Sequence, residues 1–368
     1  GLQNGEKIMD KQMEEVLGAW GLAEVCTRCY PFGNGHINDT YCVECITDKY
    51  VLQRINHLVF TKPAQVMDNI SRVTAHIRAK GQLTLNVVPT LDDKPYYKDS
   101  KGCWWRVYDF IRGAVTYELI KDSNMMYEAG RAIGDFSRLL SDFPIGTLYE
   151  TIPHFHDTPA RFEALKEAVK HDKFGRLKGC GKEVAFMMDR EKETSFMTDL
   201  QKKGDIPTRV TINDTKINNV MFDEKTDRAV CVIDLDTVMP GIIGNDFGDA
   251  VRIGCCMAEE DEKDLSKVVF NMDYYNAFRK GFLESCGDSL SELEIATLAM
   301  AAKLRTFEDG IRFLTDHLSG DVYFKIHREN HNLDRCRTQL KMVEQMEELL
   351  DARKSAFGPD KKKDKKNR

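Results

Sequence analysis

Four polar residues near position 220 have the types and spacing that phosphoryl transfer requires. Asp214 is followed by Lys216 and Asn219, and the apolar run 229–233 then ends in Asp234. Asp214 can accept the proton of an attacking hydroxyl, and Lys216 can neutralise charge on the phosphoryl group in transit. Asn219 and Asp234 offer the hard oxygen ligands that Mg²⁺ prefers. The layout predicts the catalytic loop and metal-binding strand of an enzyme that uses Mg²⁺ and ATP.

A polar turn between two strands is the alternative explanation, because Asn and Asp tolerate turn backbones. Such a turn would explain Asn213 and Asn218. It does not require a carboxylate at the end of an apolar strand, where Asp234 is costly unless it has a partner such as a metal ion. We therefore favour phosphoryl transfer.

A glycine-containing turn and a strand upstream of this loop could bind the nucleotide. Gly33, Asn34 and Gly35 form the turn of a predicted hairpin, whose backbone amides could face phosphates. The predicted strand 50–55 follows and carries Arg54 where kinases place a phosphate-contacting base. Ordinary hairpins use the same turn residues, and Arg54 could also be a cation at a strand edge in solvent.

The order of the predicted elements indicates two lobes. A helix at 63–78 is followed by strands at 85–91 and 103–110, and helical periodicity takes over after Arg112. In such a layout adenine lies at the connection, near the backbone of Phe110 and Ile111. We expect a helical extension at 1–20, a nucleotide-binding lobe at 21–111, a catalytic lobe that also binds the acceptor at 112–357 and a basic tail at 358–368.

Composition excludes several other classes of protein. The 368 residues carry a net charge of −6, which argues against nucleic acid as a main partner. No apolar run approaches the roughly 18 residues of a membrane span. Eleven scattered cysteines fit a reducing compartment. We expect a cytoplasmic monomer or weak dimer whose partners are small molecules, with no membrane contact.

Four cysteines have a spacing close to that of a zinc ribbon: Cys26, Cys29, Cys42 and Cys45. If their segment is a symmetric hairpin, Cys26 faces Cys45 and Cys29 faces Cys42. Residues three apart on a strand point to opposite faces, so this arrangement predicts two thiol pairs and no tetrahedral site.

The two histidines of the segment 154–156 are interpreted as a loop pair.

Five strings in this order resemble a known family: 52–56, 213–219, 233–239, 245–249 and 310–316. They are similar to the corresponding strings of bacterial N-acetylhexosamine 1-kinases, in the aminoglycoside phosphotransferase superfamily, over about 25–342. The resemblance implies an α+β, bilobal, protein-kinase-like fold, with a small β-rich N-lobe and a larger helical C-lobe. It implies transfer of the ATP γ-phosphate to the anomeric hydroxyl of N-acetylglucosamine or N-acetylgalactosamine, giving the sugar 1-phosphate and ADP.

The resemblance also implies the substrate-binding residues. Asp236 and Thr237 would lie beside the metal site, Asp246 and Arg312 would bind sugar hydroxyls, and Phe247 and Tyr323 would offer a flat apolar surface. Without it, Asp246 could cap a helix or anchor a loop, and the two aromatic residues could belong to the core.

One position departs from the pattern. Kinases of this superfamily usually have His two residues before the catalytic Asp, where this chain has Ile212. That His supports the loop, so its loss puts the rigidity of the loop in question. The alternatives are a kinase of the same fold for an aminoglycoside, an amino alcohol or another sugar, and a catalytically silent nucleotide-binding module. A polycationic acceptor would need a strongly acidic cleft. Such an acceptor stays possible because acidic residues occur at Asp236, Asp246, Asp249 and 259–262.

Overall fold

The computed structural model describes residues 10–33 and 37–350, and it divides into two compact units. The first unit contains the described chain up to Thr116 together with Asp142–Ile152 and Val220–Pro240. The second contains Tyr117–Ser141, Pro153–Asn219 and the described chain from Gly241 onward. Each unit is therefore assembled from segments that are distant in the sequence, where we had expected contiguous lobes.

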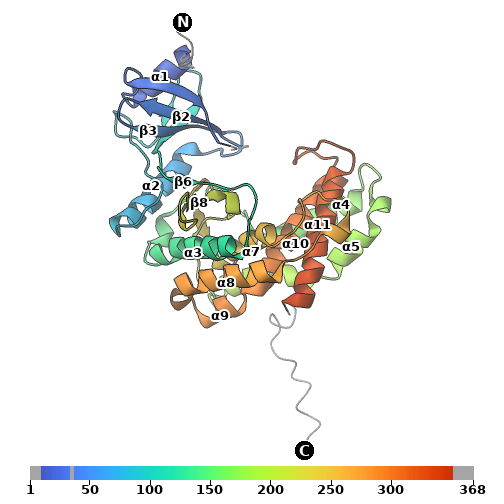
Figure 1. Ribbon diagram of the computed structural model, residues 1–368. Coiled ribbons are helices and arrows are strands. Elements are labelled where there is room, and N and C mark those ends of the chain that lie inside the picture. The colour runs from blue at the N-terminus through green and yellow to red at the C-terminus, as the bar shows by residue number, and fades with distance from the viewer. Residues whose placement is uncertain (1–9, 34–36, 351–368) are drawn as a thin grey trace, which may run out of the picture. The chain divides into compact units, whose positions relative to one another are not determined.

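The first unit is built on a five-stranded antiparallel sheet (Figure 1). Its strands, in spatial order, are β1 (Cys26–Pro31), β2 (Asp39–Cys45), β3 (Lys49–Ile55), β5 (Trp104–Asp109) and β4 (Tyr97–Lys98). The helix α1 (Lys11–Ala19) covers one face, where Val16 and Leu17 pack with Leu52 and Trp105. Because side chains alternate along a strand, Gln53 points to the opposite face.

The hairpin β1–β2 has a shifted register. Cys26 faces Cys45, as predicted, but Cys29 faces Val43 instead of Cys42. The register changes just after Cys26, and such an irregularity moves every later pair by one position. Among the described residues, no group of three or more His, Cys, Asp or Glu side chains could hold a metal ion.

The first unit also contains a helix and a small sheet. The helix α2 (Pro63–Ala79) begins with proline at its first turn and buries Val66, Ile70 and Val73, which confirms the predicted periodicity. The predicted strand 85–91 forms only one isolated bridge, from Val87 to Tyr108. Strands β6 (Ala114–Val115), β8 (Val220–Asp223) and β9 (Ala229–Val232) form a three-stranded sheet.

The second unit is helical. Its helices are α3 (Ser123–Leu139), α4 (Thr158–His171), α5 (Gly181–Met188), α6 (Phe196–Lys202), α7 (Ile243–Gly254), α8 (Met272–Cys286), α9 (Glu292–Ala296), α10 (Leu298–Leu318) and α11 (His331–Leu349). The short strands β7 (Arg209–Thr211) and β10 (Met239–Gly241) precede and follow the 217–234 region in the sequence. No helix of the described residues is long and apolar enough to cross a membrane.

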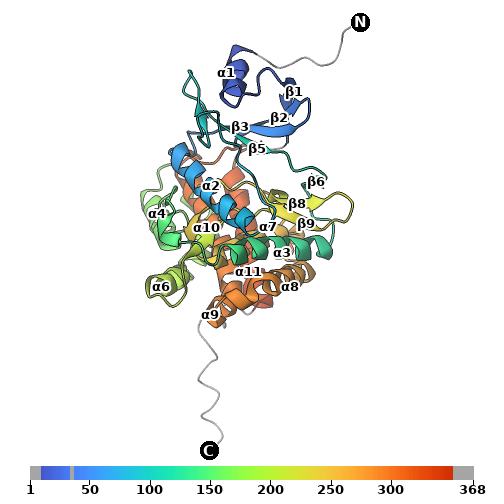
Figure 2. The same ribbon diagram turned by 90° about the vertical axis from the view of Figure 1, so that its left-hand side faces the viewer.

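Two helix contacts set the core of this unit. The helices α3 and α8 lie side by side (Figure 2), and a Cβ at Gly130 would come within 2.2 Å of the Phe278 carbonyl oxygen. Only glycine permits that approach. The helix α10 is buried along most of its length and packs against α4, α7 and α11. The polar side chains of α10 are therefore forced to find partners inside the unit.

Candidate functional site

The second unit presents Asp214 on a loop between β7 and the 3₁₀ helix Ile217–Asn219. The preceding residue, Asn213, has a left-handed backbone with φ 64°, which costs free energy in a residue other than glycine. The backbone amides of Ile212 and Asn213 donate to the two carboxylate oxygens of Asp246 at 2.9 and 2.8 Å. The helix α7 thereby holds the strained turn in front of Asp214.

Asp246 is a buried anchor of this loop. Burial raises its pKa to about 7, although the two amide hydrogen bonds favour the charged form. Both of its oxygens are occupied by the loop, and the residue is 1% exposed. This corrects the prediction that Asp246 binds a sugar hydroxyl, in favour of the loop anchoring that the sequence had left open.

Phe247 belongs to the core. Its ring is completely buried and packs against the rings of Tyr275, Phe278 and Phe282 at centroid distances of 5.3–5.9 Å. No face of the ring is open to a ligand, which corrects the prediction of an aromatic surface at this position. The physical reason is the helical position: Phe247 follows Asp246 on α7 and points into the α8 side of the unit.

A buried ion network lies on the other side of Asp214. The Thr215 amide donates to Asp249 at 3.0 Å, and Asp249 pairs with Arg252 at 3.4 Å and Arg305 at 3.2 Å. Burial opposes ionisation of Asp249, but Arg305 and Arg252 outweigh it and lower the pKa of this carboxyl. Asp309 also pairs with both arginines. Charged residues of α7 and α10 therefore hold the part of the loop that follows Asp214.

Asp214 itself has a carboxylate oxygen without a hydrogen-bond partner. Within the described residues, Oδ1 is buried and unbonded, whereas the Lys216 backbone amide hydrogen-bonds to the carboxylate. Burial and the nearby Asp249 raise the pKa of Asp214, and Lys216 offsets part of this effect. A positioned carboxylate with an open oxygen and a raised pKa suits a group that receives a proton from a substrate hydroxyl. The Lys216 side chain is exposed.

The two predicted metal ligands are oxygen donors that suit Mg²⁺. Asn219 ends the 3₁₀ helix, where its amide donates to the Lys216 carbonyl at 2.9 Å. Asp234 follows β9 in the first unit, with an exposed carboxylate and a left-handed backbone of φ 61°. Mg²⁺ commonly takes one or two protein oxygens and completes its octahedron with phosphate and water. A side-chain amide oxygen and a carboxylate oxygen are therefore both ligand types that fit this ion.

Asp236, two residues after Asp234, is enclosed by partners of the first unit. Arg106 of β5 donates from both terminal nitrogens to the two carboxylate oxygens, with Nη2–Oδ2 at 3.0 Å. Asn38, beyond the hairpin turn, donates to Oδ2 at 2.7 Å. Gln53 accepts from Arg106 Nε at 2.8 Å. The predicted substrate contact of Asp236 is thus replaced by a structural one, and its neighbour Thr237 is half-buried.

Arg54 lies on the wrong face of the sheet for the predicted contact with phosphate. It shares the face of Leu52, which packs against α1, and it pairs with Asp39 on the neighbouring strand. Gln53 and Arg106 occupy the opposite face, the one that holds Asp236. The correction follows from strand alternation, because a shift by one residue reverses the face.

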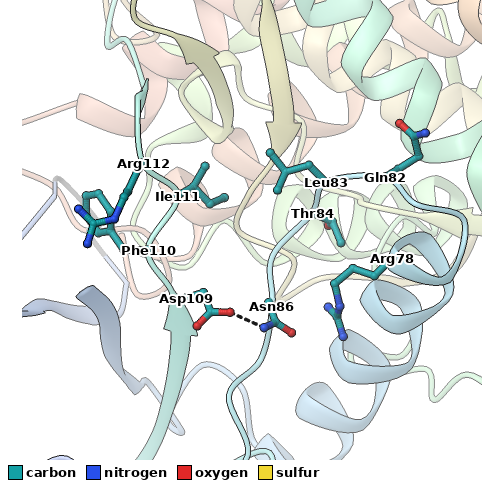
Figure 3. A pocket seen from close by; sticks show the side chains of 9 residues that line it. All are labelled: Arg78, Gln82, Leu83, Thr84, Asn86, Asp109, Phe110, Ile111 and Arg112. Atoms are coloured by element: carbon teal, nitrogen blue, oxygen red, sulfur yellow. Dashed lines mark hydrogen bonds between the residues drawn. The ribbon is translucent and has the colours of Figure 1, made fainter. Parts of the chain in front are cut away.

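Phe110 and Ile111 line a cavity of about 490 Å³ in the first unit (Figure 3). The other lining residues are Arg78, Gln82, Leu83, Thr84, Asn86, Asp109 and Arg112. Figure 3 shows Asn86 donating to Asp109 across the cavity wall. The Phe110 ring also lies 5.7 Å from that of Phe32, at the start of the hairpin turn. Gly33 has φ 77°, and Asn34 and Gly35 lie outside the described residues.

Arg312 and Tyr323, both predicted from the resemblance, lie together in the second unit. The Arg312 guanidinium is 5.4 Å from the Tyr323 ring centroid, and that residue is 72% exposed. Asp316 fixes the segment by accepting the backbone amides of residues 322–324 at 2.9–3.0 Å. The result is an exposed aromatic ring beside a cation, on a loop held by α10.

Sequence reasoning missed Arg106, Asn38, His156 and Glu308. A signal existed for Arg106, because a charged residue inside an apolar strand must find a buried partner. His156 was interpreted as part of a loop pair. The structure instead places its ring nitrogens 3.1 Å from Glu308 and 3.4 Å from the Asn213 carbonyl oxygen.

Comparison with known proteins agrees with this architecture. Residues 28–268 match the family model described as the phosphotransferase enzyme family. A microcompartment-associated aminopropanol kinase superposes with a TM-score of 0.63 at 16% identity, covering 92% of this chain and 97% of that one. A spectinomycin phosphotransferase, solved with ADP and spectinomycin, gives 0.59 at 13% identity, covering 93% and 99%. The ethanolamine kinase of Plasmodium vivax gives 0.56 at 14%, covering 88% and 85%. These likenesses show the fold alone and confirm the predicted α+β, kinase-like class.

Proposed function

The chain belongs to the phosphotransferase enzyme family, and we propose that it transfers the γ-phosphate of ATP to the anomeric hydroxyl of an N-acetylhexosamine. The observation that carries the proposal is the state of Asp214. Its buried Oδ1 has no partner among the described residues, while the backbone on both sides is anchored by Asp246 and Asp249. A rigid loop that ends in an open carboxylate oxygen is prepared to receive one proton.

The chemistry asks little of the protein beyond positioning and charge neutralisation. The sugar oxygen forms a bond to the γ-phosphorus as the bond to the bridging oxygen of ADP breaks. The hydroxyl proton passes to Asp214, whose raised pKa favours holding it. The exposed Lys216 ammonium reaches the phosphoryl oxygens in transit. When bound by Asn219 and Asp234, Mg²⁺ supplies neutralisation of the phosphate charge.

The acceptor site is proposed at the Arg312–Tyr323 pair. Asp309, which belongs to the network that supports the loop, lies 3.9 Å from Arg312. Arg312 therefore contacts that network through a residue one turn earlier on α10. The exposed face of Tyr323 suits a sugar ring or an acetamido methyl. Arg312 supplies hydrogen-bond donors for hydroxyl oxygens.

The distribution of charge favours a neutral acceptor over a cationic one. Four of the acidic residues that had left a cationic acceptor open have cationic partners. The pairs are Asp236 with Arg106, Asp249 with Arg252 and Arg305, Glu260 with Arg252, and Asp261 with Arg328 and His331. The proposed acceptor site itself carries a cation. An amino alcohol or aminoglycoside would meet repulsion there, although such acceptors appear in the names of proteins that share the fold.

Phosphorus NMR of the protein with Mg-ATP and either N-acetylglucosamine or N-acetylgalactosamine tests the proposal. We expect a new sugar phosphate signal coupled to the anomeric proton, and none with Asp214→Asn. Ethanolamine and an aminoglycoside serve as matched acceptors. ATP consumed only with those amines would replace the acceptor class. Nucleotide binding without turnover of any acceptor would establish the silent module instead.

A further inference from the structure

We propose that His156, held by Glu308, is the positioning residue that replaces the missing histidine of the catalytic loop. The proposal rests on the proposed role of Asp214 as proton acceptor. His156 precedes α4 and lies 57 residues before Asn213, yet its Nε2 is 3.4 Å from the Asn213 carbonyl oxygen. Its Nδ1 is 3.1 Å from Glu308 Oε2 on α10. The two side chains are 8% and 1% exposed.

The bonded carbonyl is part of the peptide that leads into Asp214. The carbonyl of Asn213 and the amide of Asp214 share one rigid plane. A hydrogen bond to that oxygen therefore restricts the orientation of the backbone from which the Asp214 side chain extends. Asp246 holds the amide side of Asn213, and His156 holds its carbonyl side. The left-handed backbone of Asn213 is thus fixed at both ends, as a strained conformation requires.

The loop cannot supply this anchor itself. The Ile212 side chain is apolar and fully buried, so it has no group that could bond to a carbonyl. The imidazole of His156, in the segment before α4, contacts this turn instead. The sequence departure at position 212 is therefore compensated by a residue distant in the chain.

The partners of His156 also determine its protons. A backbone carbonyl only accepts, so the contact with the Asn213 oxygen places a proton on Nε2, while Nδ1 faces Oε2 of Glu308. Arg305 lies 3.4 Å from the same Oε2, and Oε1 of Glu308 is buried without a hydrogen-bond partner among the described residues. Loss of His156 removes the shorter of these two contacts to Oε2 and leaves the one with Arg305.

Hydrogen–deuterium exchange of the full chain tests the positioning role without any assumption about the acceptor. We expect the amides of peptides covering 209–219 to exchange roughly fivefold or more faster in His156→Gln than in the wild type. His154→Gln is the matched control, because His154 lies in the same segment with its side chain 80% exposed, and exchange there should not change. Equal exchange in wild type and His156→Gln, with both melting normally, would overturn the proposal.

Turnover gives the second readout. With Mg-ATP, kcat should fall roughly tenfold or more in His156→Gln, while the KM for nucleotide stays within about twofold. Adding Ile212→His to that variant should restore part of both kcat and loop protection. A global loss of folding would instead show in the melting curve and in exchange across the whole chain, and that pattern would reject a local role. If N-acetylhexosamines prove not to be acceptors, the role of His156 is tested by two other comparisons of the wild type with His156→Gln. These are the rate of ADP release without acceptor and the hydrogen exchange of the loop.

Discussion

Arg106 and Asp236 lie 130 residues apart in the sequence and form a bidentate ion pair with both side chains 2% exposed. The pair joins the central sheet to the segment that carries Asp234. Burial disfavours the charged guanidinium, but Asp236 outweighs this effect and raises the pKa of Arg106. The nearby Asn38 donates to the same carboxylate, so the strand after the hairpin turn is attached to the same anion.

Asp236→Asn should therefore lower the free energy of unfolding by about 3–5 kcal/mol, because it leaves Arg106 buried without a counter-charge. The double variant Arg106→Met with Asp236→Leu should lose much less. Urea denaturation of the wild type, Arg106→Met, Asp236→Leu and the double variant measures the coupling. Asp39→Asn is the matched control: its pair with Arg54 lies in the same sheet but is 44–50% exposed. A loss there as large as at Asp236 would contradict the argument from burial.

Arg54→Ala should leave the KM for Mg-ATP within about twofold of the wild type. Its side chain shares the sheet face that packs against α1, and it pairs with Asp39 at the surface. Steady-state kinetics with varied ATP provide the measurement. A tenfold rise in KM would mean that Arg54 reaches the nucleotide after all.

Asp246 should make stability depend on pH. Its pKa is raised from 3.8 to about 7 in the fold, so between these values the folded protein binds more protons than the unfolded chain. Stability from this group is therefore present below about pH 4 and is lost as pH rises through about 7. The full effect is about 4 kcal/mol, at about 1.36 kcal/mol per tenfold change in proton affinity.

The measurement is the difference in unfolding free energy between the wild type and Asp246→Asn, taken from pH 4 to 8 by denaturant titration. Because other carboxyls contribute equally to both proteins, the difference should fall with rising pH and level off above about 7. A difference that stays constant over this range would show that Asp246 is ionised throughout.

Arg312→Ala should weaken binding of the acceptor and leave binding of the nucleotide unchanged. Loss of a charged hydrogen-bond donor costs roughly 1.5–3 kcal/mol, so the acceptor KM should rise by roughly tenfold or more. Tyr323→Leu removes the flat ring beside it and should act in the same direction. Initial rates with each substrate varied in turn check both variants. An unchanged acceptor KM in both would remove this surface from the site.

The loop that carries Asp214 and Asn219 could be predicted from sequence, because residues a few positions apart are placed by local spacing and need no distant partner. The helix α2 was predictable for a similar reason, since the period of Val66, Ile70 and Val73 marks the buried face. The sequence also indicated the kinase-like class, through the order of its short strings.

Tertiary structure alone decided which charges face each other. Asp246 could bind sugar or anchor a loop until α7 placed it against the amides of Ile212 and Asn213. Arg54 and Arg106 both lie on strands, and only the sheet showed that their side chains point to opposite faces and have different partners. The substitute for the missing loop histidine lay 57 residues away. The physical reason is that local spacing fixes which residues share a turn, whereas a buried polar group is satisfied by whichever partner long-range packing brings within about 3 Å.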